Sequence, residues 1–220
     1  MKDFAGQPDA REVDILVFPE CFLQGYLMEV DHVRRHALNL HSGRFSEVRR
    51  RLARITQTLV FGVIEQQGGS YFNTAVVLTR GELVGVYRKT HLTSGEGPFH
   101  QGEAYPTFEM QGIRFGINIC YDTQFREAAA RVAVQGARLL LVPSQNMMPR
   151  DRAVHWQHRH HRIRAERARE TGMWIVSADV TGARDERRVG LGPTSVLNPH
   201  GEVVGQVPSM TTGMVVAEIY

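Results

Sequence analysis

The sequence predicts an α/β layered fold whose sheets contain antiparallel hairpins. Helical and strand-like patterns alternate in the first part of the chain, and strand-like segments dominate after residue 172. This order disfavours a purely doubly wound parallel sheet, in which helices and strands would alternate to the end. The 220 residues are 42% hydrophobic and contain no internal repeat or linker-like stretch. We therefore predict a single domain over residues 1–220 with one well-buried core.

The first half is predicted to place one amphipathic helix among strands. Residues 13–18 (VDILVF) form an apolar run that predicts a strand. In residues 44–59 apolar side chains recur at helical spacings of three and four. Strands are then predicted over residues 59–66 and over two runs within residues 71–92. The two runs turn around Gly81, because glycine supplies the positive φ of a tight hairpin.

The second half is predicted to begin with a strand and a helix and to end in strands. A strand over residues 112–120 (GIRFGINIC) precedes a helix over residues 124–137, which stops near Gly136, a residue suited to a helix C-terminus. Residues 138–143 predict another strand, and residues 151–171 have a helical composition. The remaining strands are predicted in three segments, residues 173–179, 194–207 and 213–220.

The composition favours a cytoplasmic enzyme over a nucleic-acid or membrane protein. The formal net charge is only +3, and ten histidines can add charge in mild acid. No apolar run approaches the roughly 20 residues of a membrane helix, and no secretion signal is evident. Without such a signal we expect Cys21 and Cys120 to be free thiols. We expect no nucleic-acid partner, no membrane partner and a cytoplasmic location.

Three chemically reactive side chains each follow an apolar strand. Glu20 comes after residues 13–18, Lys89 follows the second hairpin strand, and Cys120 closes the strand at residues 112–120. Taken singly, Glu20 and Lys89 could be solvated strand ends, and Cys120 could be a small buried apolar residue. Strand ends in α/β folds gather at one edge of a sheet, where sites are built. We therefore expect the three side chains to lie together.

Together the three groups predict acyl transfer without histidine. A carboxylate can accept the thiol proton, the thiolate can attack an electron-poor carbon, and an ammonium can stabilise the negative charge that develops. Cys120 also precedes a predicted helix, whose N-terminal dipole favours the thiolate. Cys21 is expected to be a packing residue, because it faces away from Glu20 if the chain stays extended.

The sequence resembles the nitrilase superfamily of carbon-nitrogen hydrolases, in particular its amidase-like branch. The three family signatures occur in order as VFPECFLQGY, YRKTHL and GINICYDTQF. Further similarity runs through GARLLLVPSQN, RAERARETG, SADVTG and GPTSVLNPHGEVVG. The resemblance implies an αββα four-layer sandwich that forms homo-oligomers, with no cofactor and no metal. Compared with the family, the chain is N-terminally short, because a strand and a helix usually precede the first signature.

The same resemblance assigns roles to individual residues. Glu20 is implied as the general base, Lys89 as the electrostatic stabiliser and Cys120 as the nucleophile. Glu96 matches a second family glutamate that orients the lysine or the substrate, and the backbone N–H of Tyr121 would be the other oxyanion donor. The implied activity is hydrolysis of a non-peptide carbon–nitrogen bond through a cysteine thioester. The expected substrate is a small amide or N-carbamoyl compound, with a nitrile less favoured.

The alternative is a non-catalytic or binding protein on the same fold. The stretch HWQHRHHRIRAERARE concentrates histidine and arginine on one predicted helix. The i,i+3 spacing of His155 and His158, and of His158 and His161, is that of paired metal ligands, and a basic helix could also bind nucleic acid. We favour a solvated helix with Trp156, Ile163 and Ala168 turned inward, because no nearby carboxylate or cysteine completes a metal set.

Overall fold

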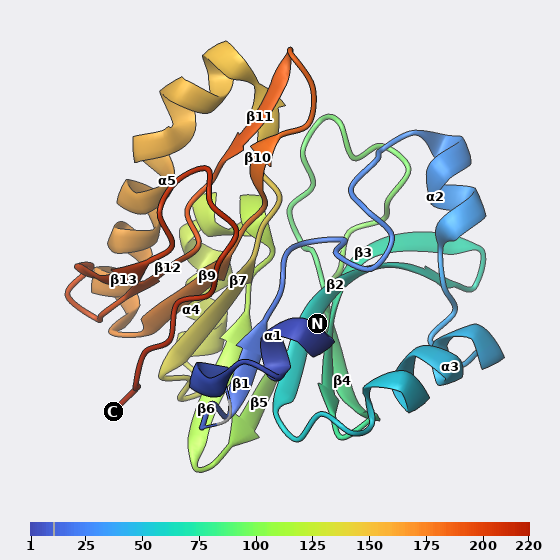
Figure 1. Ribbon diagram of the computed structural model, residues 1–220, viewed down its shortest axis with the longest axis horizontal. Coiled ribbons are helices and arrows are strands. Elements are labelled where there is room, and N and C mark those ends of the chain that lie inside the picture. The colour runs from blue at the N-terminus through green and yellow to red at the C-terminus, as the bar shows by residue number, and fades with distance from the viewer. Residues whose placement is uncertain (11) are drawn as a thin grey trace.

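Two β-sheets stacked face to face, with helices on both outer faces, form the frame of the protein (Figure 1). The computed structural model describes residues 1–10 and 12–220. Apolar clusters fill the space between the two sheets and the space between each sheet and its helices. The four-layer αββα arrangement expected from the sequence is thereby confirmed.

The first sheet has four strands in the order β1-β2-β3-β4. The short strand β1 (Ile15–Val17) runs parallel to β2 (Thr58–Gln67). β2 then pairs antiparallel with β3 (Ser70–Thr79), and β3 with β4 (Glu82–Arg88). Arg80 and Gly81 both have positive φ, at 49° and 80°, as a tight two-residue turn requires. The hairpin predicted around Gly81 is confirmed.

The second sheet has six strands in the order β13-β12-β9-β7-β6-β5. Its centre is parallel, because β6 pairs parallel with β7 and β7 with β9, whereas the flanking pairs are antiparallel. A small third sheet has the order β10-β11-β8. These strands are β5 (Thr107–Met110), β6 (Ile113–Ile117), β7 (Leu139–Pro143), β8 (Met147–Pro149), β9 (Trp174–Ala178), β10 (Thr181–Ala183), β11 (Arg188–Leu191), β12 (Ser195–Leu197) and β13 (Val203–Gln206).

Helices flank each sheet on its outer side. α2 (Val30–His36) and α3 (Gly43–Leu52) lie beside the first sheet, and α4 (Arg126–Ala133) and α5 (Arg150–Thr171) beside the second (Figure 1). Short helical turns are α1 (Lys2–Ala5), η1 (Pro8–Ala10) and η2 (Cys120–Gln124). Across the described part of the chain, no helix has both the length and the apolar character needed to cross a membrane.

The helix predicted over residues 44–59 is shorter than expected. α3 begins after Ser42, whose Oγ accepts a hydrogen bond from the Phe45 backbone N–H at 3.3 Å, and it ends at Leu52. Ile55 packs into the same apolar cluster from the connecting turn, and Leu59 already belongs to β2. The apolar spacing therefore predicted one long helix where the structure has a shorter helix, a connecting segment and the first residues of β2.

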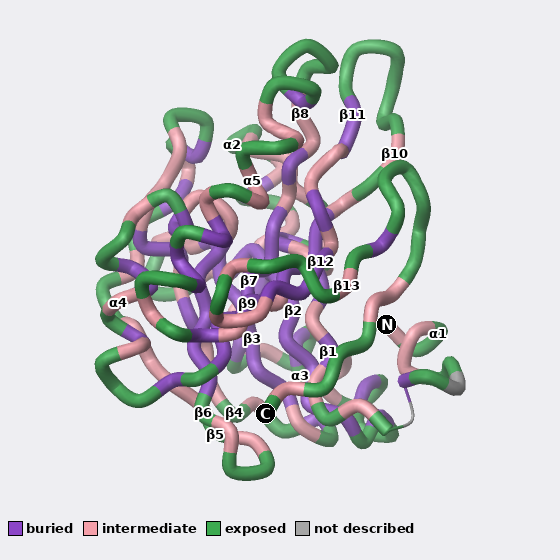
Figure 2. The backbone as a smooth tube through the Cα atoms, turned by 90° about the vertical axis from the view of Figure 1, so that its left-hand side faces the viewer, coloured by how far each residue is buried: buried purple, intermediate pink, exposed green. Residues whose placement is uncertain are grey.

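The strands alternate their side chains between neighbouring layers. In β2, Leu59 and Phe61 join the apolar cluster on the α3 side, whereas Val60 faces the second sheet. In β7, Leu140 packs toward α4 and α5, whereas Leu139 faces the first sheet. Figure 2 shows the result as buried strands in the middle of the molecule and exposed segments around them. This rigid double sheet fixes the positions from which the functional side chains project.

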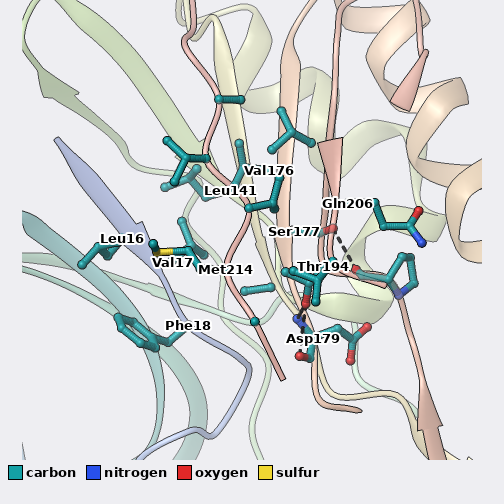
Figure 3. A pocket seen from close by; sticks show the side chains of 18 of the residues that line it. Leu16, Val17, Phe18, Leu141, Val176, Ser177, Asp179, Thr194, Gln206 and Met214 are labelled. Carbon is teal, nitrogen blue, oxygen red and sulfur yellow. Dashed lines mark hydrogen bonds between the residues drawn. The ribbon is translucent and has the colours of Figure 1, made fainter. Parts of the chain in front are cut away.

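Residues 213–220 do not form the strand that their apolar pattern predicts. Within the described residues, β1 also has no strand on its outer side. The segment and β1 both line a cavity of about 1160 Å³, to which Val17, Leu141, Val176 and Met214 contribute (Figure 3). A strand is stable only as part of a backbone ladder, and the described residues provide none for this segment, so its pattern alone does not produce a strand.

Candidate active site

Glu20, Lys89 and Cys120 converge from three strand ends. Glu20 follows β1, Lys89 follows β4 directly, and Cys120 begins η2 after β6. Lys89 Nζ lies 2.8 Å from Glu20 Oε1. Burial raises the pKa of the Cys120 thiol; the charge of Glu20 raises it further, and that of Lys89 lowers it. The three groups therefore lie within electrostatic reach of one another, as the strand-end pattern predicted.

The backbone around Glu20 is held between both sheets. The Gly62 N–H donates to the Pro19 carbonyl at 3.0 Å, and the Glu20 N–H donates to the Ser144 carbonyl, at the end of β7, at 3.3 Å. Gly62 must be glycine, because a Cβ there would lie 2.6 Å from the carbonyl carbon of Glu20. At Cys21 the chain leaves the extended conformation, with φ of 47°. Glu20 therefore projects from a backbone that is fixed on both sides.

Lys89 lies between two carboxylates in the protein interior. Besides Glu20, it donates to Glu96 Oε1 at 3.0 Å and to Glu96 Oε2 at 2.9 Å. The side chains of Lys89, Glu20 and Glu96 are at most 1% exposed. Burial alone would lower the pKa of Lys89, but the charge of Glu20, with those of Cys120 and Glu96, holds it well above its ordinary value. Lys89 is therefore a permanent cation at neutral pH.

The same surroundings adjust Glu20 for proton transfer. Burial raises its pKa to about 7, although the Lys89 charge opposes the rise. Oε1 accepts hydrogen bonds from Lys89 and from Asn73, whereas Oε2 is buried and has no hydrogen-bond partner among the described residues. A carboxyl group with a pKa near neutrality and one unpartnered oxygen can both accept and return a proton.

Cys120 occupies a strained backbone position at the start of η2. Its φ is 44°, in the left-handed region that non-glycine residues rarely adopt, and such strain clusters at functional sites. Its Sγ donates to Asn146 Oδ1 at 3.6 Å. The element that Cys120 begins is the short 3-10 helix η2 rather than the longer helix expected to favour the thiolate, and burial raises the pKa of this thiol. Cys120 is therefore a thiol that requires a base.

A buried chain of polar contacts supports Cys120 from α5. Asn146 donates its backbone N–H to Asp179 Oδ1 at 2.9 Å. Asp179 lies 3.7 Å from the buried guanidinium of Arg164, which also donates to Ser177 Oγ at 2.9 Å. Arg164 therefore fixes Asp179, which in turn fixes the Asn146 amide beside the thiol.

Asp122 ties the cysteine turn to the strand end that carries Lys89. Its Oδ2 accepts from the Ile119 N–H and from the Tyr87 hydroxyl, each at 2.8 Å. Its Oδ1 accepts from the backbone N–H groups of Thr90 at 3.2 Å and His91 at 2.8 Å. One fully buried carboxylate thus fixes the distance between two catalytic candidates.

The family resemblance implied Glu96 and Tyr121, whose roles stay predictions, and the sequence reasoning missed several supporting residues. Glu96 lies beside Lys89, and Tyr121 is the second residue of η2, where backbone N–H groups have no acceptor inside the helix. The missed residues are Asn73, Asp122, Asn146, Arg164 and Asp179. A signal was available for two of them, because Asn73 is a polar residue inside an apolar strand and Asp179 directly follows one. Asp122 and Asn146 lie farther beyond the strands that precede them, and Arg164 was hidden among the other arginines of its helix.

Helix α5 differs from the solvated helix predicted for the His/Arg-rich stretch. Arg164 and Arg167 are buried and face the core, whereas Trp156 and Ile163 are only partly buried. Burial, together with the charge of Arg164, lowers the pKa of His160 to about 3. Among the described residues no group of three or more histidine, cysteine or acidic side chains could hold a metal ion. Two of its arginines thus serve the interior rather than a ligand-binding surface.

The large cavity beside β1 does not contain the reactive cluster. Its lining includes Pro19 and Asp179, the neighbours of the site, but not Glu20, Lys89 or Cys120. The candidate active site is therefore defined by the hydrogen bond between Lys89 and Glu20 and by the electrostatic influence of both on Cys120, rather than by the volume of the cavity.

Comparison with known proteins matches the whole chain to one family. The carbon-nitrogen hydrolase family profile matches residues 1–220. An (R)-stereoselective amidase of Pseudomonas sp is 29% identical over 196 residues, which cover 89% of this chain and 69% of the amidase.

Solved structures share the fold. A glutamine-dependent NAD+ synthetase from Acinetobacter baumannii superimposes with a TM-score of 0.82 at 26% identity, over 96% of this chain and 40% of that chain. A mutant amidase from Nesterenkonia sp. AN1, with the acetamide moiety of fluoroacetamide added covalently at its active-site cysteine, gives a TM-score of 0.77 at 23% identity, over 96% of this chain and 79% of that one.

Proposed function

The chain belongs to the carbon-nitrogen hydrolase family, and on this premise we propose that it hydrolyses a small amide through a thioester on Cys120. Glu20 acts as the proton-transfer residue and Lys89 as the cation that stabilises the oxyanion. Glu96 holds Lys89, and the Tyr121 backbone N–H is the second oxyanion donor.

The first half of the reaction forms the thioester. Cys120 Sγ attacks the amide carbonyl carbon while its proton passes to Glu20, and the carbonyl oxygen becomes an oxyanion beside Lys89. The oxyanion collapses, the carbon–nitrogen bond breaks, and Glu20 returns the proton to the departing nitrogen. Ammonia or an amine leaves, and the acyl group stays on sulfur.

The second half regenerates the enzyme. Glu20, again ionised, takes a proton from water as the water oxygen attacks the thioester carbon. The second oxyanion collapses, the carbon–sulfur bond breaks, and Glu20 protonates the departing thiolate. The products are a carboxylic acid and the free Cys120 thiol.

The unpartnered Oε2 of Glu20 is the observation that carries this assignment. A buried carboxylate oxygen without a hydrogen bond is costly, and it is explained if Oε2 accepts the Cys120 thiol proton during turnover. The pKa of Glu20 near 7, raised by burial, suits a group that both accepts and donates a proton. The high pKa of the Cys120 thiol, raised by burial and by Glu20, explains why a base is needed.

The proposed substrate class is a small amide, as the name of the Pseudomonas amidase suggests. N-carbamoyl compounds present the same carbonyl carbon and remain within the proposal, and nitriles are less favoured. A binding protein that uses α5 is the weaker candidate, because Arg164 and Arg167 are buried.

We also propose that the protein is a homo-oligomer. Exposed apolar side chains gather near the C-terminal end at Val203, Val204, Met210 and Val216, and the outer edge of β1 has no strand partner within the described residues. Multi-angle light scattering tests this: a monomer at all concentrations contradicts it. The cytoplasmic location stays a prediction.

Ammonia release from a panel of small amides, N-carbamoyl compounds and nitriles tests the proposed function. We expect release from at least one amide or carbamoyl compound and none from the same panel with Cys120→Ala. Nucleic-acid binding at low salt that is lost at high salt, with a silent panel, would instead support the binding protein.

A further inference from the structure

Asn73 contacts both carboxylates of the proposed site. Its Nδ2 donates to Glu20 Oε1 at 2.7 Å and to Glu96 Oε1 at 2.8 Å. The Asn73 carbonyl also accepts the backbone N–H of Lys89 at 2.9 Å, so the strand that holds Asn73 fixes the lysine as well. The side chain is fully buried in β3. Asn73 is therefore in direct contact with all three members of the buried ion cluster.

The orientation of the Asn73 amide follows from its partners. Two carboxylate oxygens can only accept hydrogen bonds, so the NH₂ group must face them and Oδ1 must point the other way. On that side Cys21 Sγ donates to Asn73 Oδ1 at 3.6 Å. Burial and the charge of Glu20 raise the pKa of the Cys21 thiol well above its ordinary value, so it keeps the proton that it donates.

We propose that Asn73 is a positioning residue for the base: its amide binds the same Glu20 oxygen as Lys89, which leaves Oε2 free to take the thiol proton, and Cys21 orients that amide. This inference rests on the proposed function and adds two residues to it. It also separates the two cysteines, since Cys120 reacts and Cys21 orients.

The hydrogen bond from Asn73 to Glu20 also affects the ionisation of Glu20. A hydrogen bond to a carboxylate favours its ionised form, so the Asn73 contact lowers the pKa of Glu20 against the larger effect of burial, which raises it. The other titratable groups coupled to Glu20 are Lys89, Glu96, Tyr26 and the two thiols. Loss of the amide leaves those groups in place and shifts the ionisation of Glu20 toward higher pH.

The rate of Cys120 alkylation by iodoacetamide, measured against pH by peptide mass spectrometry, tests the inference. In this reaction sulfur bonds to carbon, iodide leaves, and the thiol proton is removed, so the rate reports the base without any amide substrate. In the wild type we expect a step near pH 7, the pKa of Glu20, which Glu20→Gln abolishes. If the wild type shows no such step, the proposed function fails.

With the step present, Asn73→Leu should move its midpoint upward by about one pH unit or more, because a hydrogen bond to a charged group is lost. Cys21→Ala should move it in the same direction by less. Cys21→Ser keeps a hydroxyl donor and should return the midpoint toward that of the wild type. A slower reaction with an unmoved midpoint in Asn73→Leu would mean a purely structural role. If Asn73→Leu does not fold, identical midpoints in the two Cys21 variants overturn the inference.

Discussion

Lys89 Nζ and Glu20 Oε1 lie 2.8 Å apart although the residues are 69 positions apart in the chain, and both side chains are 1% exposed. Glu96 contacts the same ammonium. One cation thus faces two carboxylates in a buried site, and this charge imbalance is one reason for the raised pKa of Glu20, after burial itself. Removal of one partner from such a cluster leaves a buried charge unpaired.

Lys89→Ala should lower kcat by about a hundredfold or more, as expected for loss of an oxyanion-stabilising group. Lys89→Arg should not restore the rate fully, because the planar guanidinium presents its charge differently. Ammonia release measures the effect, with circular dichroism to check folding. Lys2→Ala, at the only other lysine, is the matched control and should keep the wild-type rate. Full activity in Lys89→Ala contradicts the role.

The value of kcat/KM should rise with pH through a midpoint near 7, the pKa to which burial raises Glu20. The carboxylate must be ionised to accept the Cys120 proton, so activity is low below that value and reaches a plateau above it. Initial rates from about pH 5 to about pH 9 give the profile. A profile without a rise in this range shows that Glu20 is not the base.

Folding stability should carry the opposite dependence on pH. The pKa of Glu20 is about 7 in the folded protein and 4.5 ordinarily, so its contribution to stability is fully present below pH 4.5 and is lost as the pH rises through 7. Glu20→Gln has no such loss. The melting temperature of the variant minus that of the wild type should therefore increase from about pH 5 to about pH 8. An equal difference at both pH values refutes this linkage.

Gly62→Ala should destabilise the protein by about 1–3 kcal/mol and reduce activity, because overpacking forces the backbone to move. The added methyl group would overlap the backbone of Glu20 and Cys21. Gly43→Ala is the control, since nothing lies within 4 Å of a Cβ at that position in the first turn of α3. Urea unfolding and ammonia release measure both variants. Equal stability of the two variants would show that the close approach at Gly62 has no cost.

The sequence pattern predicted an α/β layered fold with antiparallel hairpins, because strand-like runs are separated by turn residues such as Gly81, whose φ is positive. The double sheet itself was implied by the family resemblance. The sequence pattern also predicted the convergence of Glu20, Lys89 and Cys120, since strand ends meet at one edge. These features depend on local patterns and on simple topology.

Features that depend on distant partners were not predicted. Residues 213–220 have a strand pattern but no ladder partner in the described part of the chain, so they stay irregular. Asn73 looks like an ordinary polar interruption of β3 until the fold brings Glu20 and Glu96 to its amide. The pKa of the Cys120 thiol is likewise decided by burial, which the short helical turn after it does not overcome.

Intact-mass spectrometry with peptide mapping after brief incubation with fluoroacetamide or an activated ester tests the central claim most directly. Nucleophilic catalysis by Cys120 predicts a single adduct on the peptide that contains Cys120, none in Cys120→Ala, and no turnover in that variant. Cys21→Ala should still form the adduct, with a packing cost of about 1 kcal/mol. An adduct on Cys21, or full activity in Cys120→Ala, would contradict the account.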